Sequence, residues 1–199
     1  GVQTCALPIY TTVEQILTNR GIKREDIQHY LNTTDEDINS YQDFGIEVLQ
    51  GAAAALITAI NLGQDAIIIV DSDCDGFTSA ALIYNYLYDT FTTWAAAHLS
   101  YKIHNGKQHG LNDHIQNILA NLNNQPKLII IPDAGSNDVS ECKALWDKKC
   151  PTIILDHHIC DIKNPYAFVI NNQISFISII FHNIFRSEEH TSELQSLAY

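Results

Sequence analysis

The sequence predicts an α/β fold in which helices flank a parallel sheet and a helical segment precedes it. Short apolar runs of strand length, residues 66–70, 127–132 and 151–155, alternate with helical patterns of about ten residues. This alternation is typical of a parallel sheet with helices on both faces. Acidic or histidine residues follow each run directly, as expected if a ligand binds at the carboxyl ends of the strands.

Residues 10–62 are predicted to be helical. Apolar residues recur at helical spacing over 11–22, where the helix stops at Gly21, and over a shorter stretch at 24–32. Residues 37–63 predict a long helix with an alanine-rich middle suited to close packing, ending near Gly63.

The α/β part is predicted to hold five strands and three helices. A strand at 66–70 is apolar on both faces, as in a buried parallel strand, and Thr78 or Ser79 is the expected N-cap of the helix that follows. The other expected strands are 98–104, 127–132, 151–155 and 166–170, and the expected helices are 78–91, 111–122 and 136–149.

Composition indicates a globular protein without attraction to polyanions. Hydrophobic residues make up 46% of the 199 residues and charged residues 17%, which favours a sizeable core. Because the formal net charge is −12, phosphate groups would have to be handled by local cations, and bound metal is the obvious source.

The cysteines and the hydropathy pattern predict a cytoplasmic protein that does not enter the membrane. The chain has five cysteines but no C-x-x-C pair and no secretory signal, which is typical of a reducing compartment. No apolar run approaches the roughly 18 residues of a membrane span.

Both ends of the chain are predicted to be foreign to the protein. "GVQTCALPI" at 1–9 and "RSEEHTSELQSLAY" at 186–199 resemble translated sequencing-adapter read-through, and the chain contains no methionine. We therefore expect non-native tails at 1–9 and 186–199, a helical segment at 10–62, and a truncated α/β domain at 63–185.

Three predicted strands each deliver carboxylates or imidazoles to the same edge of the sheet. No lysine or arginine lies within these motifs, and crowded carboxylates without counter-charge are strongly unfavourable. Divalent cations would supply that charge, and oxygen and imidazole ligands suit Mn²⁺ or Mg²⁺, with zinc possible. The residues concerned are Asp71, Asp73, Asp75, Asp133, Asp156, His157 and His158.

Three other interpretations of these motifs are weaker. A calcium-binding EF-hand loop also begins D-x-D-x-D-G, but it needs a glutamate at its twelfth position, here Leu82, and a helix before it. An aspartyl-phosphate phosphatase needs threonine or valine where Asp75 stands. Aspartates that merely cap helices could explain one motif, but three in succession make this coincidence improbable.

Residues 102–110, "KIHNGKQHG", form a basic loop after a predicted strand. Lys107 and His109 could contact substrate phosphates, or the loop could simply be solvated, and the sequence leaves both readings open. Ser79 is a further candidate for substrate binding, because the helix that begins there points its N-terminus at the same edge of the sheet.

"VDSDCDGFTSAAL", "IIIPDAGSND" and "ILDHH", in this order, resemble the DHH phosphoesterase superfamily, and "DSDCDG" and "PYAFVINNQ" are most similar to its RecJ-type single-strand-specific 5′-to-3′ exonucleases. The resemblance covers about residues 60–173. It implies an α/β domain that binds two Mn²⁺ or Mg²⁺ ions. By this resemblance Asp73, Asp75, Asp133 and His157 are metal ligands, Asp133 bridges the ions, and His158 faces the scissile phosphate.

The sequence departs from this pattern in three places. Many members carry a histidine where Ile69 stands, so either Asp71 substitutes as a ligand or the first metal site is weak. The fourth acidic motif is not recognisable after Gln173, and the second domain of these enzymes is absent. We therefore expect the parent protein to be a nuclease and leave the activity of this chain open.

The predicted activity is metal-dependent hydrolysis of a phosphodiester in single-stranded DNA. His158 would act on the phosphate or the leaving oxygen, and Asp156 would orient its neighbours. Two alternatives stay open: hydrolysis of oligonucleotides, cyclic dinucleotides or pyrophosphate by the same chemistry, and a catalytically silent scaffold. Self-association through an exposed sheet edge is also expected.

Overall fold

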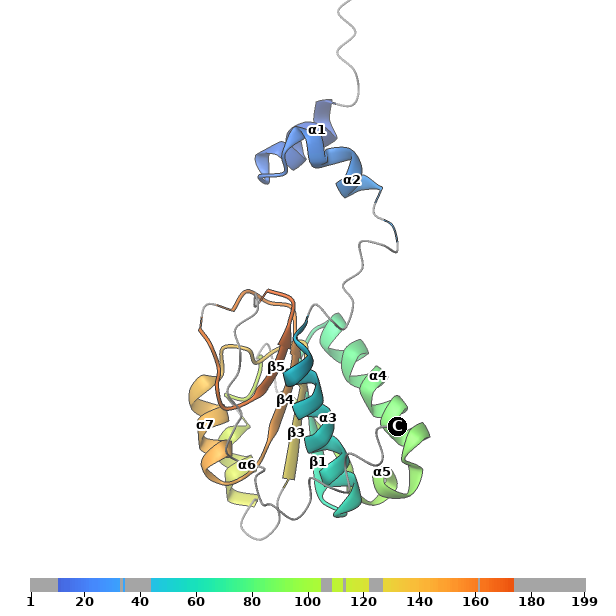
Figure 1. The fold of residues 1–199 in the computed structure, drawn as a ribbon, viewed down its shortest axis with the longest axis vertical. Coiled ribbons are helices and arrows are strands. Elements are labelled where there is room, and N and C mark those ends of the chain that lie inside the picture. Colours follow the sequence, from blue (N-terminus) through green and yellow to red (C-terminus); the bar gives the residue numbers. More distant parts are fainter. Residues whose placement is uncertain are drawn as a thin grey trace, which may run out of the picture. The chain divides into compact units, whose positions relative to one another are not determined.

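The computed structural model describes residues 11–32, 34, 44–104, 109–112, 114–121, 127–160 and 162–173. The chain divides into two compact units, residues 1–40 and 41–199, and each is described by itself. The smaller unit contains helix α1 (Thr11–Asn19), the 3₁₀ helix η1 (Arg24–Asp26) and helix α2 (Ile27–Leu31) (Figure 1). Both helices predicted here are confirmed.

The larger unit is built on a five-stranded sheet in the order β2-β1-β3-β4-β5, and all four neighbouring pairs are parallel. The predicted parallel α/β fold is therefore confirmed. The strands are β1 (Asp65–Val70), β2 (Leu99–Ile103), β3 (Lys127–Pro132), β4 (Thr152–Asp156) and β5 (Phe168–Asn171).

Helices cover both faces of the sheet (Figure 1). Helices α3, α4 and α5 pack on one face, and α6 and α7 pack on the other. Their bounds are α3 (Ile46–Asn61), α4 (Cys74–Thr90), α5 (Thr92–His98), α6 (Ile115–Asn121) and α7 (Val139–Asp147).

The core consists of two hydrophobic layers separated by the sheet. Successive side chains of a strand point to opposite faces, so Ile68 and Ile130 join the α3–α5 layer while Ile69 and Ile129 join the α6–α7 layer. Because both faces are covered there, the central strands β1 and β3 are buried and apolar along most of their length rather than alternating, whereas the edge strand β2 is partly exposed.

Helix α3 belongs to the core of the sheet-containing unit. Val48, Ala52, Ala55 and Ala59 are buried in the same hydrophobic layer as β1 and β3. The helical segment predicted for 10–62 is therefore divided in the structure between the two compact units.

Most elements differ from their predicted bounds by one to four residues, and the helices on the α3–α5 face differ most. Helix α3 begins at Ile46, after Gly45 with φ 82°, and residues 37–43 of the predicted helix lie outside the described residues. Helix α4 begins at Cys74, so the expected N-cap at Thr78 or Ser79 is wrong: the Asp73 carboxylate caps the helix instead. Helix α5 was not predicted.

The strand order creates a topological switch point between β1 and β3. The chain passes from β1 to its neighbour β2 on one side and then crosses to β3 on the other. Connections that leave β1 and β3 in opposite directions open a crevice at the carboxyl ends of the two strands, where ligands of such sheets bind.

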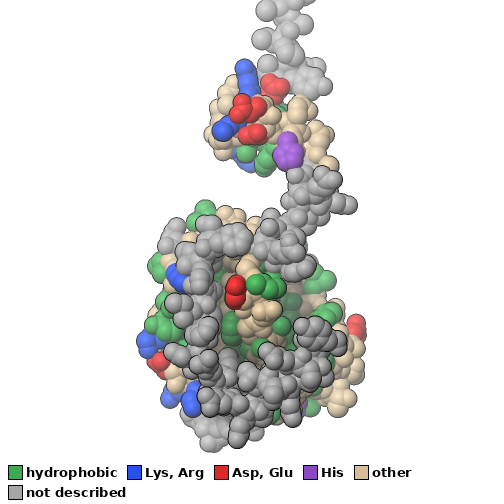
Figure 2. Space-filling view, in the orientation of Figure 1, with side chains coloured by type: hydrophobic (Ala, Val, Ile, Leu, Met, Phe, Trp, Pro, Cys, Tyr) green, Lys and Arg blue, Asp and Glu red, His purple; other side chains and the backbone are tan. Residues whose placement is uncertain are grey.

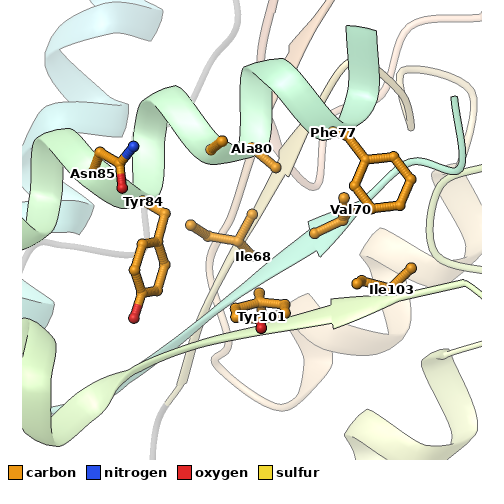
Figure 3. Close-up of a pocket in the computed structure, with 9 residues that line it drawn as sticks. Ile68, Val70, Phe77, Ala80, Tyr84, Asn85, Tyr101 and Ile103 are labelled. Atoms are coloured by element: carbon orange, nitrogen blue, oxygen red, sulfur yellow. The ribbon is translucent and has the colours of Figure 1, made fainter. Parts of the chain in front are cut away.

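A separate groove of about 290 Å³ lies between α4 and the strands β1 and β2 (Figure 3). Its wall is mostly apolar and includes Phe77, Tyr84 and Tyr101. Because none of the described residues that line it has a carboxylate, imidazole or cationic side chain, the groove is distinct from the site predicted at the strand ends.

Figure 2 shows the types of side chain on one face of the surface. On the face in Figure 2, the visible lysine and arginine side chains of the larger unit lie along one margin. Among the described residues, no helix combines the length and the apolar character needed to cross a membrane.

Candidate metal centre

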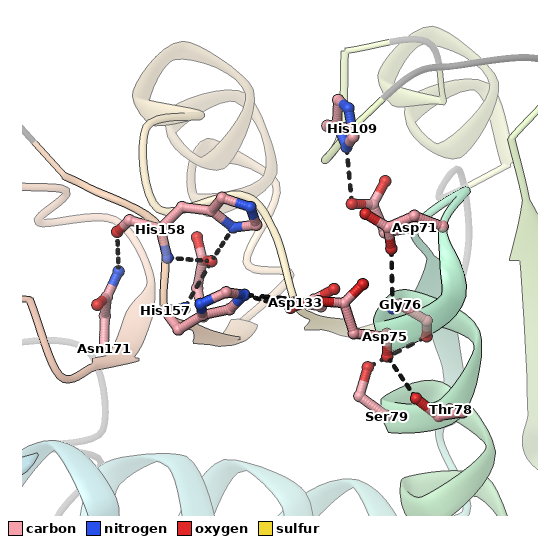
Figure 4. A network of polar contacts seen from close by, with 12 residues as sticks. Asp71, Asp75, Gly76, Thr78, Ser79, His109, Asp133, His157, His158 and Asn171 are labelled. Carbon is pink, nitrogen blue, oxygen red and sulfur yellow. Dashed lines mark hydrogen bonds and ion pairs between the residues drawn. The ribbon is translucent and has the colours of Figure 1, made fainter. Parts of the chain in front are cut away.

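Asp71 is the first residue after β1 and one of the most buried polar side chains described, with 1% of its surface exposed. Its Oδ1 accepts the N–H of Ser72 at 2.9 Å. Its Oδ2 lies 2.7 Å from Nδ1 of His109, which comes from the segment after β2 (Figure 4). This hydrogen bond, and then the charge of Asp71, raise the pKa of His109.

Asp73 is the N-cap of helix α4. Its Oδ1 accepts the N–H of Gly76 at 3.0 Å, and this hydrogen bond lowers the pKa of Asp73. Gly76 is required here because a Cβ at this position would lie 2.5–2.9 Å from atoms of Asp71. The glycine after the three aspartates thus lets the first turn of the helix approach Asp71 and holds Asp73 and Asp75 near it.

Asp133 follows β3 in a left-handed backbone conformation, φ 70°, which aspartate tolerates better than most residues. Its N–H donates to the carbonyl of Leu155 at 2.6 Å, which ties the turn to β4. Its Oδ1 lies 3.0 Å from Nε2 of His157, whereas its buried Oδ2 has no hydrogen-bond partner among the described residues. Burial, and then the charge of Asp75, raise the pKa of Asp133.

His157 follows β4 and links two of the strand ends. Besides its contact with Asp133, its Nε2 lies 3.9 Å from Oδ2 of Asp75, at the start of α4 (Figure 4). The turns after β1, β3 and β4 therefore meet at one place, as the topology required.

Asp156 orients the two histidines that follow it. It accepts the N–H groups of Ser136, His157 and His158 at 2.7–3.1 Å, and its Oδ1 lies 2.8 Å from Nδ1 of His158. Burial alone would raise the pKa of Asp156, but these hydrogen bonds outweigh burial and lower it. The hydrogen bond between the Asp156 carboxylate and Nδ1 of His158 raises the pKa of His158.

The sequence predicted no role for Asn171 and Ser136, two polar residues near the turn after β4. The buried side chain of Asn171, at the end of β5, donates to Oγ of Ser136 at 2.9 Å and to the carbonyl of His158 at 2.9 Å. Asn171 thus joins β5 to the turns after β3 and β4. The stretch "PYAFVINNQ" contains it, but nothing in the local pattern indicated this contact.

The predicted ligands form a continuous chain of donor atoms. Three groups each have their donor atoms within 4.8 Å of one another: Asp71, Asp73 and His109; Asp73, Asp75 and Asp133; and Asp133, His157 and His158. Asp73 belongs to the first two groups and Asp133 to the last two. Metal binding by these residues stays a prediction.

The predicted substrate-binding residues fare differently. His109 lies beside Asp71, within this cluster. The Ser79 hydroxyl donates to the carbonyl of Gly76 at 3.1 Å, inside the first turns of α4. Lys107 lies outside the described residues. Ile69 is fully buried in the α6–α7 layer, so its position contributes no ligand.

Comparison with known proteins agrees with this architecture. Residues 65–198 match the family described as "DHH family, N-terminal domain". The chain is 34% identical, over 160 residues, to a putative SPbeta prophage-derived single-strand DNA-specific exonuclease YorK of Bacillus subtilis and to its counterpart in Bacillus phage SPbeta; the match covers 80% of this chain and 26% of each relative. The chain thus spans about a quarter of their length.

The fold resembles a solved structure, that of RecJ from Thermus thermophilus in complex with Mn²⁺. The TM-score is 0.51 at 20% sequence identity, over 83% of this chain and 24% of that chain. This likeness confirms the arrangement of the sheet and its helices. With the family match over residues 65–198, it bears out the resemblance seen in the three motifs, and the chain belongs to the DHH family.

Proposed function

We propose that this chain is a fragment of a metal-dependent, RecJ-like exonuclease that hydrolyses phosphodiester bonds of single-stranded DNA from the 5′ end, and that it contains part of the catalytic domain. Membership of the DHH family and 34% identity to relatives named as single-strand DNA-specific exonucleases support the substrate class. The cluster of carboxylates and imidazoles at the strand ends supports the reaction type.

The observation that carries the proposal is the buried Oδ2 of Asp133, which has no hydrogen-bond partner among the described residues. A carboxylate oxygen left without a hydrogen bond costs folding free energy, and neighbouring Asp75 adds repulsion. A divalent cation removes both costs. The donor set around it, carboxylate oxygens with imidazole, fits Mn²⁺ or Mg²⁺.

Two such ions would be held by Asp71, Asp73, Asp75, Asp133 and His157. Asp133 belongs both to the group with Asp73 and Asp75 and to the group with His157 and His158, so it would be shared between the ions. When bound, the ions would activate water and neutralise charge on the phosphate.

His158 and Asp156 would act on the substrate side of the reaction. With Nδ1 of His158 held by Asp156, Nε2 is the nitrogen left to donate a hydrogen bond to a phosphate or leaving oxygen. The raised pKa of His158 favours the protonated form that can donate. The N-terminus of the 17-residue helix α4 lies at the same edge and favours an anionic substrate.

The test compares Asp133→Asn and Asp133→Ala with the wild-type chain. Mn²⁺ binding is measured by calorimetric titration, and hydrolysis is measured on 5′-labelled single-stranded DNA with the chain and with the intact parent protein. We expect both substitutions to abolish Mn²⁺ uptake and hydrolysis. Asp65→Asn, at the opposite end of β1, is the matched control and should change neither.

Two results would overturn the proposal. Retained hydrolysis in Asp133→Asn would contradict the bridging role, and a wild-type chain without a micromolar Mn²⁺ site would favour a silent scaffold. Faster cleavage of a cyclic dinucleotide, a short oligonucleotide or pyrophosphate than of DNA would instead assign the same chemistry to a small substrate.

A further inference from the structure

We propose that His109 is a metal ligand, which together with Asp71 and Asp73 forms a coordination group at the carboxyl end of β1. This inference rests on the proposed function, because it concerns the same ions. It replaces direct contact with the substrate, the role predicted for His109 from its basic loop, by a structural role in holding a cation.

The strand order brings His109 to this position. Strand β2 lies beside β1 on the side opposite β3, and His109 follows β2 in the chain. His109 thereby meets Asp71, 38 residues earlier in the chain, at 2.7 Å (Figure 4). The end of β1 thus has His109 on one side and Asp133 on the other.

The donor atoms are close enough to share one ion. One atom each from Asp71, Asp73 and His109 lies within 4.8 Å of the others, and Asp73 also belongs to the group with Asp75 and Asp133. That second group contains the buried Oδ2 of Asp133, for which the described part of the chain offers no hydrogen-bond partner. Two groups that share one carboxylate and each have access to an imidazole, His109 and His157, suit two neighbouring cations.

A second histidine–aspartate pair shows what an ordinary ion pair looks like in this fold. At the opposite end of β1, Nδ1 of His98 lies 3.0 Å from Oδ1 of Asp65, and Nζ of Lys127 lies 3.8 Å from Oδ2 of Asp65. Lysine supplies counter-charge there. Among the ion pairs of the described residues, none joins a lysine or arginine to Asp71 or Asp73, and a bound cation would stabilise these crowded carboxylates.

The experiment titrates MnCl₂ into the full chain and into three variants. His109→Gln can still donate a hydrogen bond to Asp71 but is a poor nitrogen ligand, His109→Ala removes both functions, and His98→Gln is the matched control. Free Mn²⁺ is counted by electron spin resonance, and imidazole nitrogens coupled to bound Mn²⁺ are detected by its pulsed form. Circular dichroism verifies folding; His109 is largely exposed.

We expect His109→Gln and His109→Ala to weaken one of two Mn²⁺ sites by about 10- to 100-fold, with loss of one set of nitrogen couplings, while His98→Gln binds as wild type. Unchanged binding and couplings in His109→Gln, with weakening only in His109→Ala, would reduce His109 to a hydrogen-bond partner of Asp71 and overturn the inference alone. A wild-type chain that binds no Mn²⁺ would overturn the proposed function as well.

Discussion

At the scale of single residues, the strand ends concentrate groups whose ordinary ionisation is disturbed. Asp133 and Asp138 lie in one turn region after β3, and burial raises the pKa of both. Asp133 belongs to the candidate metal cluster. Asp138 does not: its Oδ2 accepts the N–H of Leu111 at 2.7 Å, which joins the start of α7 to the segment before α6. Its contribution to stability can therefore be tested separately from metal binding.

Asp138 is predicted to make the protein less stable as pH rises from about 4 to about 6. Burial raises its pKa from 3.8 to about 6, so in this range the folded protein holds a proton that the unfolded chain has released. Stabilisation is complete below the unfolded pKa and is lost as pH rises through the folded pKa. We expect Asp138→Asn to remove this loss, worth about 1–2 kcal/mol after solvent screening.

The measurement is the free energy of unfolding from urea titrations between pH 4 and pH 7, compared as the difference between variant and wild type. Asp147→Asn is the control, because Asp147 is exposed and paired with Lys143. A difference between Asp138→Asn and wild type that does not vary with pH would contradict the proposed burial effect.

At the scale of elements, helix α4 couples the stability of the fold to the candidate site, because the residue that caps the helix is also a candidate metal ligand. The Oδ1 of Asp73 accepts the N–H of Gly76, while Asp73 belongs to two of the three groups of donor atoms. Capping and metal binding need different chemistry: a hydroxyl can cap a helix, but it is a weak ligand for a divalent cation beside carboxylates.

Substitution at Asp73 is predicted to separate these two roles. Asp73→Ser should keep the cap, so its free energy of unfolding should lie within about 0.5 kcal/mol of the wild-type value. Asp73→Ala should lose the cap, and its free energy of unfolding should fall by about 1 kcal/mol. Both should lose Mn²⁺ affinity. Urea denaturation and calorimetric Mn²⁺ titration give the two readouts, and full Mn²⁺ affinity in Asp73→Ser would exclude its carboxylate as a ligand.

At the scale of the whole molecule, both hydrophobic layers lie within the larger unit. Every buried residue of the two layers falls between Val48 and Val169, and residues 1–40 form a separate compact unit. The two layers that cover the sheet therefore consist of residues that follow residue 40.

A chain that begins at Tyr41 is predicted to keep the fold and the Mn²⁺ affinity of the full chain. Thermal unfolding followed by circular dichroism should give a transition within a few degrees of the full chain, and the metal titration should be unchanged. A chain without α3, beginning at Asn61, is the contrasting variant: it should lose cooperative unfolding, because Ala52, Ala55 and Ala59 are part of the core.

Self-association stays a prediction at this scale. The edge strand β2 exposes Tyr101 and Ile103, and an exposed edge can pair with another chain. Sedimentation over a range of concentrations would detect association, and a single monomeric species throughout would exclude it.

The strands, and the acidic and histidine residues that directly follow β1, β3 and β4, were predictable because their sequence patterns are local. The predicted strand at 127–132 has the same bounds as β3, because short apolar, β-branched runs of this length are typical of buried strands. The helix starts were less accurate. Asp73 caps α4 through the N–H of Gly76, so the helix starts before the cap expected at Thr78 or Ser79, and the local pattern did not show which of the polar residues in this stretch is the cap.

The sequence by itself determined that acids and histidines follow three strands, and parallel connections then require these residues to share one edge of the sheet. Only the tertiary structure decided that His109 meets Asp71 and that Asn171 holds Ser136 and the backbone of His158. These pairs are 38, 35 and 13 residues apart. Their contacts depend on which strands are neighbours, and strand order arises from the packing of the whole sheet rather than from any local pattern.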